Sequence, residues 1–293
     1  MLTIRSINLF TDWIGIVKAE LENRGYSFTE NDSYEVISIR YYNYLKRVIP
    51  VKPRQIIKSD IFNCPVALAP GLAALESKIQ TGQDTFPHLS RKLKKLDERD
   101  DLLYDWGIYH LHLGTALEND GYMRRSGPVL FCLYDETHFY FLDVMPHGSW
   151  TKQELLRSIH RNWPHLIDDF RIKSNGLIRP EYNVTDDELG GLRGVNVNTI
   201  IEVEPGLIYA SPGGGFTASG HSVEVMQRHW NNKENLEEFE GKIKADPEKL
   251  LKSVYGSDLS FISNPALSFK LVKVGGKYQL KELNNDFSML LNF

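Results

Sequence analysis

The sequence predicts an α+β fold, in which an antiparallel β-meander packs with helices and a second, smaller α+β region follows. Helical spacing of apolar residues recurs early in the chain, and three short runs rich in β-branched and aromatic residues stand in its middle. Two further strand pairs are expected toward the end. At 293 residues the chain exceeds the commonest size of a single core, so two domains are expected.

Apolar residues at helical spacing predict helices over residues 8–24, 71–81 and 88–103. A glycine stop signal closes the second of them, and four leucines fall near one face of the third. Another helix is expected after the meander, where Ser149 or Thr151 could cap it, with Glu154 three residues beyond Thr151. Two more are expected toward the end of the chain, over "HSVEVMQRHW" and "KENLEEFEGKI".

The strands of the meander are predicted in "WGIYHLHLG", "PVLFCLYD" and "HFYFLDVMP", with a tight hairpin at Asp135 and Glu136. The second region begins with "NTIIEVEPGLIYASPGGG", which reads as a strand pair turning at Pro205-Gly206. It ends with "SFKLVKVGGKYQLKEL", whose strands turn at Gly275-Gly276. The glycine-rich "SPGGGFTASG" lacks the lysine of a phosphate-binding loop and is interpreted as a tight loop.

A polar stretch around residues 172–198 predicts the domain boundary. Residues 1–175 are expected to form a catalytic domain with an N-terminal helical extension, and residues 176–293 an acidic regulatory or partner-binding domain. Residues 181–250 hold 13 acidic and six basic residues, whereas residues 40–58 hold six basic residues and no acidic one. This asymmetry suits a phosphate-binding part followed by an acidic one, although solvated surface is an equally good explanation of both clusters.

The sequence predicts a cytoplasmic protein without a membrane partner. No apolar run approaches the roughly 18 residues that cross a bilayer, and the N-terminus has the pattern of an amphipathic helix rather than of a signal peptide. Cys64 and Cys132 stand in apolar contexts, as expected for buried thiols in a reducing compartment. Two cysteines also exclude a zinc site built from thiolates alone.

The most informative stretch is "HLHL" in the first strand of the meander. Residues two apart on a strand share a face, so His110 and His112 point one way while Leu111 and Leu113 point the other. The leucines make their face the expected core side. The two imidazoles are therefore expected on a polar face that could form the floor of a cleft.

Other polar and aromatic side chains are expected at the ends of the neighbouring strands. Arg124 and Arg125 precede the second strand, and His147 and Trp150 follow the third. Imidazole can act as acid and base near neutral pH, and the arginine fork suits phosphate oxygens. These groups together predict cleavage of a phosphodiester without a metal or other cofactor.

The order of features over residues 92–157 resembles the RelE/ParE superfamily of ribonuclease toxins and gyrase poisons. "LKKLDERDDLLYDWGIYHLHLG" would match the family's helix and first strand, "RRSGPVLFCLYD" its second strand, and "HFYFLDVMPHGSW" its third. His110 and His112 would then stand where the family often has basic residues, and His147 at its terminal histidine. The match covers about a fifth of the chain, and the segment between Gly114 and Arg124 is longer than the family's short turn.

The resemblance implies an RNA substrate, often cleaved at the ribosome. In our interpretation His110 or His112 removes the proton of the ribose 2′-OH, and the other histidine or His147 protonates the leaving 5′-oxygen. Arg125, with Arg124, stabilises the charge on the phosphate, and the product is a 2′,3′-cyclic phosphate. The chain would then be a toxin or anti-phage effector, with an inhibitory protein as its second partner.

The stretch "RYYNYLKRVIPVKPRQIIK" interleaves tyrosines with basic residues. Aromatic rings stack on unpaired bases and cations hold phosphates, so Arg47, Lys52 and Arg54 are candidate substrate-binding residues, like Trp150. The competing interpretation, a helix with half-buried tyrosines and solvated lysines, is the favoured one.

Two further functions fit the same histidines. His110, His112 and His147 with Asp143 could supply three nitrogens and one oxygen to zinc or ferrous iron, as in a metal hydrolase. A non-enzymatic two-domain binding or immunity-type protein would leave the histidines as ordinary surface.

Overall fold

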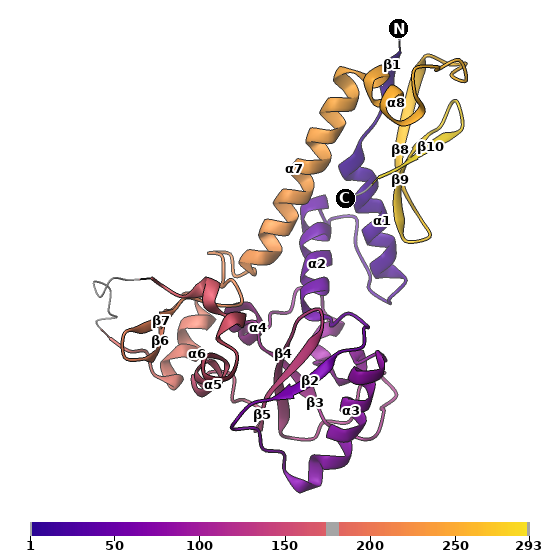
Figure 1. Ribbon diagram of the computed structural model, residues 1–293. Helices are drawn as coiled ribbons and strands as arrows, with labels where there is room; N and C mark the ends of the chain where they lie inside the picture. The colour runs from indigo at the N-terminus through magenta and orange to yellow at the C-terminus, as the bar shows by residue number, and fades with distance from the viewer. Residues whose placement is uncertain (1, 174–181, 292–293) are drawn as a thin grey trace. The chain divides into compact units, whose positions relative to one another are not determined.

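The computed structural model describes residues 2–173 and 182–291 and confirms the α+β fold. The helices in these residues are α1 Leu9–Glu22, α2 Tyr34–Arg47, α3 Ala69–Thr81, α4 Asp101–Trp106, α5 Glu154–Asn162, α6 Asp186–Gly194, α7 Val223–Ala245 and α8 Pro247–Tyr255 (Figure 1). The strands are β1 Thr3–Ser6, β2 Gln55–Lys58, β3 Tyr109–His112, β4 Val129–Tyr134, β5 His138–Met145, β6 Ile201–Glu204, β7 Leu207–Tyr209, β8 Ala266–Val274, β9 Lys277–Glu282 and β10 Phe287–Leu290.

The chain forms two compact units that differ from the predicted domains. Residues 1–42 and 226–293 make the first unit, and residues 43–225 make the second. The expected boundary at residue 175 is therefore wrong, because the chain on both sides of it belongs to the second unit. Part of the segment on which it was placed, residues 174–181, lies outside the described residues.

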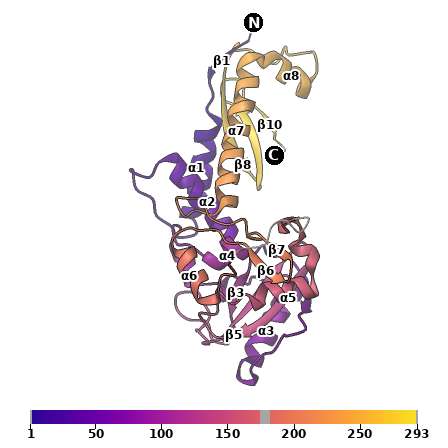
Figure 2. The ribbon, with the colours of Figure 1, turned by 90° about the vertical axis from the view of Figure 1, so that its left-hand side faces the viewer.

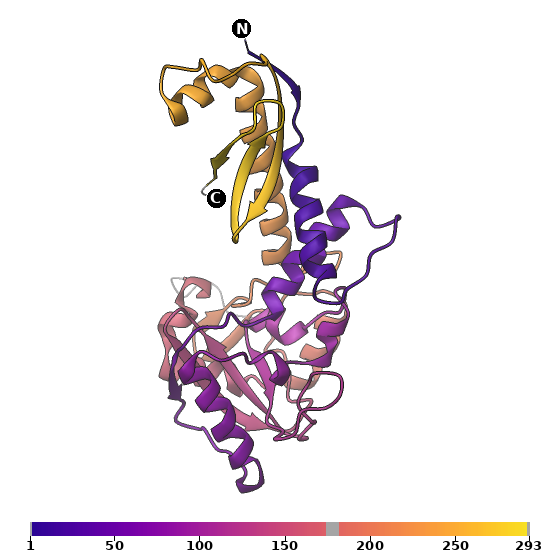
Figure 3. The same cartoon turned by 90° about the vertical axis from the view of Figure 1, so that its right-hand side faces the viewer.

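The first unit joins the two ends of the chain in one sheet of order β1-β8-β9-β10. Strand β1 pairs in parallel with β8, with Thr3 opposite Ala266, and the other pairs are antiparallel. Helices α1 and α7 supply Trp13, Val17 and Leu236 to a core shared with strand residues. Figure 3 shows the strands of this unit lying along α7 and α1.

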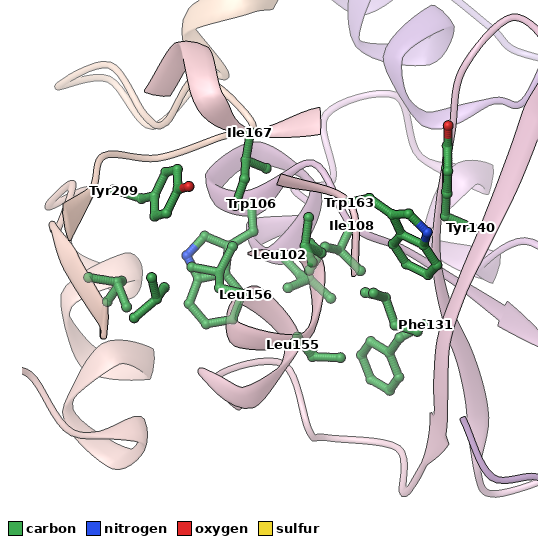
Figure 4. Packing of buried hydrophobic residues seen from close by; sticks show 14 of the residues in the cluster. Leu102, Trp106, Ile108, Phe131, Tyr140, Leu155, Leu156, Trp163, Ile167 and Tyr209 are labelled. Atoms are coloured by element: carbon green, nitrogen blue, oxygen red, sulfur yellow. The ribbon is translucent and has the colours of Figure 1, made fainter. Parts of the chain in front are cut away.

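The second unit contains the predicted meander in a sheet of order β2-β5-β4-β3. The hairpin between β4 and β5 turns at the predicted residues, while β2 pairs in parallel with β5 and was not expected. One face of the sheet packs on α5, which also contacts β6 (Figure 2). Trp106, Phe131, Tyr140, Leu155 and Leu156 meet in this core, as Figure 4 shows.

The helix predicted over residues 88–103 is wrong. The segment folds as short 3₁₀ turns, Phe86–His88 and Arg91–Lys94, and Lys95 is extended. The α-helix begins later, at Asp101, where the Asp100 side chain accepts a hydrogen bond from the Leu103 amide. Leu89, Leu93 and Leu96 are buried from consecutive turns, and Leu103 is buried from α4, so no one continuous helix carries them.

Three other local expectations are also wrong. Helix α5 begins after Gln153 and has no side-chain cap, so neither Ser149 nor Thr151 caps it. Helix α6 occupies part of the predicted polar loop and begins with a capping box between Thr185 and Glu188. The two helices predicted after residue 220 are one continuous helix, α7.

Candidate functional site

The two strand histidines lie on the core side of the sheet. In the antiparallel pairing His110 stands opposite Phe131 and His112 opposite Val129, and paired residues share a face. Phe131 and Val129 belong to the core beneath α5, and the side chains of His110 and His112 are only 8% and 4% exposed. The expected open polar face is therefore wrong: Leu111 and Leu113 are buried too, so both faces of β3 are covered.

A third histidine joins this pair at the end of β5. His147 lies in the exposed turn after β5, and its ring centroid is 6.5 Å from that of His110 and 6.0 Å from that of His112. The His110 and His112 centroids are 6.2 Å apart. The indole of Trp150 packs against His110 at 4.6 Å and His147 at 4.8 Å between centroids. The predicted convergence of His110, His112, His147 and Trp150 is thus seen in the structure.

A pocket of about 210 Å³ opens onto this cluster. Its lining combines imidazole, indole, cationic and carboxylate groups from six segments of the second unit. The lining residues are Ser90, Lys92, Asp100, Asp101, Leu102, His110, Arg125, His147, Trp150, Thr151, Gly190 and Arg193. His112 is not among them, although its ring lies beside both other imidazoles.

Asp100 faces His110 across the pocket. Its Oδ2 is 3.7 Å from Nδ1 of His110, while its other oxygen caps α4. Burial lowers the pKa of His110, the Asp100 carboxylate opposes that shift, and His147 and Lys92 reinforce it. At this distance the contact between the two side chains is electrostatic rather than a hydrogen bond.

Burial and positive neighbours keep the other two imidazoles neutral as well. Burial lowers the pKa of His112 to about 4, and His110, His147 and Arg125 add to the effect. The pKa of His147 is lowered by burial and then by Arg125 and Lys92. The lowered pKa values favour the neutral form of all three rings.

His88 is hydrogen-bonded to the backbone of β3, a role that the sequence did not reveal. Its fully buried ring donates from Nδ1 to the His112 carbonyl at 2.8 Å, and Nε2 lies 3.3 Å from Nζ of Lys78. The carbonyl can only accept, so Nε2 is left to accept from the lysine, and the ring is neutral. Burial lowers the pKa of His88 in agreement with this tautomer.

Arg193 and Asp105 form a second feature that sequence reasoning missed. Arg193 Nε donates to Asp105 Oδ2 at 2.8 Å, and its Nη1 donates to the Trp150 carbonyl at 2.6 Å. The guanidinium also stacks 4.2 Å from the ring centroid of Trp106. Both charged partners are buried, so this pair fixes the backbone of Trp150 at the wall of the pocket. No pattern around "GGLRG" signals the role.

The two adjacent arginines take different positions. Arg125 lines the pocket, and none of the hydrogen bonds or ion pairs among the described residues engages it. Arg124 is 72% exposed and lies 3.6 Å from a carboxylate oxygen of Glu118. Gly114 lets the end of β3 approach this segment, since a Cβ there would stand 2.0 Å from the Arg124 carbonyl oxygen.

The three other candidate substrate-binding residues do not line the pocket. Arg47 is buried and donates to backbone carbonyls of the 92–96 segment. Arg54 is buried as well, donates to the Asp135 carbonyl and stacks on Tyr134. Lys52 pairs with Glu136 at 2.6 Å. These contacts hold the N-terminal part of the unit onto the β4–β5 hairpin and the turns before α4.

No group of three or more His, Cys, Asp or Glu side chains within residues 2–173 and 182–291 is arranged to hold a metal. Asp143, the proposed oxygen ligand, accepts hydrogen bonds from the amides of Asn63 and Val144 instead. The glycine-rich segment packs on α4, where the Gly213 and Gly215 amides donate to the carbonyls of Asp105 and Tyr104. These two amides are already used, as expected for a tight loop.

None of the helices in the described parts of the chain has the length and apolar character needed to span a bilayer. No family model, curated protein or solved structure matches the chain, so the pocket itself is the basis for a functional assignment.

Proposed function

We propose that the protein is a metal-independent endoribonuclease whose active site is the pocket of His110, His147 and Arg125. The observation that carries the proposal is the meeting of two imidazoles, one unpaired arginine and one indole around a single pocket. The resemblance of the meander to the RelE/ParE superfamily points to the same chemistry.

The reaction needs one base and one acid. One of His110 and His147 removes the 2′-OH proton, and the 2′-oxygen attacks phosphorus. As the bond from phosphorus to the 5′-oxygen breaks, the other imidazole, in its protonated form, delivers a proton to that oxygen. The products are a 2′,3′-cyclic phosphate and a free 5′-OH, and no further reactant is required.

Binding of the phosphodiester provides the protonated histidine that the reaction needs as its acid. The pKa of each imidazole is lowered in the free protein, so an acid is lacking until an anion enters. A phosphate beside His110 and His147 stabilises the imidazolium and raises its pKa. Arg125 pairs with the phosphate oxygens and stabilises the charge that develops on them. His112 packs beside both rings and does not line the pocket, so it is given no proton-transfer role.

In vitro cleavage of total cellular RNA in EDTA tests this assignment. Wild type is expected to cleave, and His110→Ala and His147→Ala are each expected to lose at least about a hundredfold in rate, the usual contribution of acid–base catalysis. His221→Ala is the matched control, because His221 is exposed and lies outside the pocket. Arg125→Ala and Arg124→Ala form a second matched pair, in which only the first is expected to abolish cleavage.

Loss of cleavage in EDTA, with recovery on adding zinc, would favour a metal hydrolase. Well-folded wild type that cleaves no RNA would favour a non-enzymatic binding or immunity-type protein.

In the cell we place this activity in the cytoplasm, as a toxin or anti-phage effector that acts on RNA, at the ribosome in the manner of the resembling family. An inhibitory protein partner would restrain it. Growth arrest on expression, relieved by His110→Ala together with His147→Ala, is the expected outcome.

A further inference from the structure

Two basic segments lie side by side next to the pocket. Arg91, in the first of them, donates to Glu118 at 2.5 Å, and Nε of Arg124, in the second, lies 3.6 Å from the other oxygen of the same carboxylate. Asp120, in the loop before Arg124, accepts from Arg91 and Lys94, both at 2.7 Å, and holds the first segment against this loop. The segments 91–95 and 124–125 therefore form one continuous surface.

Acidic neighbours neutralise some cations of this surface more fully than others. Arg91 and Lys94 are held by Asp120 and Glu118. The Lys95 side chain is 78% exposed, and its ammonium is 3.6 Å from the Glu98 carboxylate.

Four cations form what we call the basic rim: Lys92, Lys95, Arg124 and Arg125. Lys92 and Arg125 line the pocket, and Lys95 and Arg124 lie outside it. The two pocket cations act on the chemistry directly, since Lys92 and Arg125 both lower the pKa of His147.

The burial of His110 limits what can reach it. His110 is 8% exposed and lines a space of about 210 Å³. In a duplex, base pairing and stacking keep each nucleotide in the helix and out of the pocket. An unpaired nucleotide can leave the base stack and enter the pocket. Trp150 beside His110 and His147 offers an aromatic surface of the kind on which unpaired bases stack.

We propose that the basic rim binds the sugar–phosphate backbone of single-stranded RNA and delivers one unpaired nucleotide to the pocket. This inference deepens the proposed function and rests on it for the identity of the pocket as the reacting site. Lys95 and Arg124 contact phosphates that flank the nucleotide in the pocket, and Lys92 and Arg125 contact its own phosphate.

Binding of a fluorescent, fully 2′-O-methylated 12-mer RNA tests the proposal without cleavage, because this probe lacks the 2′-OH nucleophile. Lys95→Ala combined with Arg124→Ala is expected to weaken binding roughly tenfold at 0.1 M salt. The slope of log Kd against log salt should fall by about 1.4, the value for two lost phosphate contacts on a single strand. A hairpin duplex of the same length is expected to bind at least tenfold more weakly than the single strand.

The control removes two cations from β2 and the segment before it, at the opposite edge of the sheet from β3. Lys52→Ala combined with Lys58→Ala changes the charge by the same amount and is expected to shift Kd by less than twofold. Equal losses in the two double variants, no loss in either, no binding by wild type, or duplex binding as tight as that of the single strand would each overturn the proposal.

The assay also separates this inference from the proposed function. Rim-dependent binding by a protein that leaves unmodified RNA intact would refute the ribonuclease and retain the rim. Cleavage by wild type, together with unchanged binding by the variant that lacks Lys95 and Arg124, would refute the role of the rim and retain the ribonuclease.

Discussion

His112 is a buried imidazole whose Nδ1 has no hydrogen-bond partner among the described residues. Burial of such a group disfavours its charged form, and the neighbouring rings and Arg125 add repulsion. The lowered pKa of about 4 is therefore also a statement about stability. An exposed histidine at the same position would titrate near pH 6.5 and make no such contribution.

The direction in which pH changes the free energy of unfolding follows from which state binds the proton. Between about pH 4 and 6.5 the unfolded chain binds a proton at His112 and the folded chain does not, so the free energy of unfolding falls as pH drops through this window. From pH 7.5 to 5.0 wild type should lose about 1–2 kcal/mol more than His112→Asn. Urea unfolding at both pH values measures the difference, with His221→Asn as the control. Equal losses in wild type and His112→Asn would contradict the buried, neutral state.

At the scale of elements, close approach between α3 and β3 sets the position of the histidine strand. A Cβ on Gly71 of α3 would stand 1.8 Å from the Leu113 carbonyl oxygen, which belongs to the backbone. Gly71→Ala should therefore destabilise the second unit by about 1–3 kcal/mol, despite the better helix propensity of alanine. It should also slow RNA cleavage, because β3 carries His110.

Gly191→Ala in α6 is the matched control in the same unit, since nothing lies within 4 Å of its Cβ position. That substitution should leave stability unchanged or raise it by up to about 1 kcal/mol. Urea unfolding compares the two variants, and a Gly71→Ala protein as stable as Gly191→Ala would show that the contact can relax.

Elements whose signal is local were predictable from the sequence. The meander strands and their hairpin follow from alternation and turn residues, and α1 and α3 follow from helical spacing. The segment over residues 88–103 was not predictable in this way, because buried leucines three or four residues apart fit both a helix and consecutive 3₁₀ turns. Asp100 and Gly107, which cap the two ends of α4, were the available signals of the true helix.

The site was predictable only in part. Shared strand faces and strand ends brought His110, His112, His147 and Trp150 together correctly. The face of β3 was misjudged because alternation shows which residues share a face and not whether one face or both are covered. The buried Arg193 and Asp105 pair depends on α6 packing against α4, and that contact between residues 88 positions apart leaves no local pattern.

At the scale of the whole molecule, the two ends of the chain share one sheet through the pairing of β1 with β8. Pairing between residues more than 260 positions apart cannot be seen in local sequence, which is why the domains were misplaced. All lining residues of the pocket fall within residues 43–225, in the unit that has its own core. RNA cleavage at the pocket should thus depend on the core of the second unit more than on the core of the first.

Matched leucine substitutions test this division. Leu155 in the second unit and Leu251 in the first are both fully buried, and truncation of either to alanine should cost about 2–5 kcal/mol. Below the unfolding transition, Leu251→Ala should cleave RNA at the wild-type rate. Leu155→Ala should cleave more slowly, because Leu155 packs in the core that carries Phe131, and Phe131 supports Trp150 at 5.4 Å between ring centroids. Equal loss of cleavage in both variants, at temperatures where far-ultraviolet circular dichroism shows both folded, would mean that the pocket depends on the whole chain.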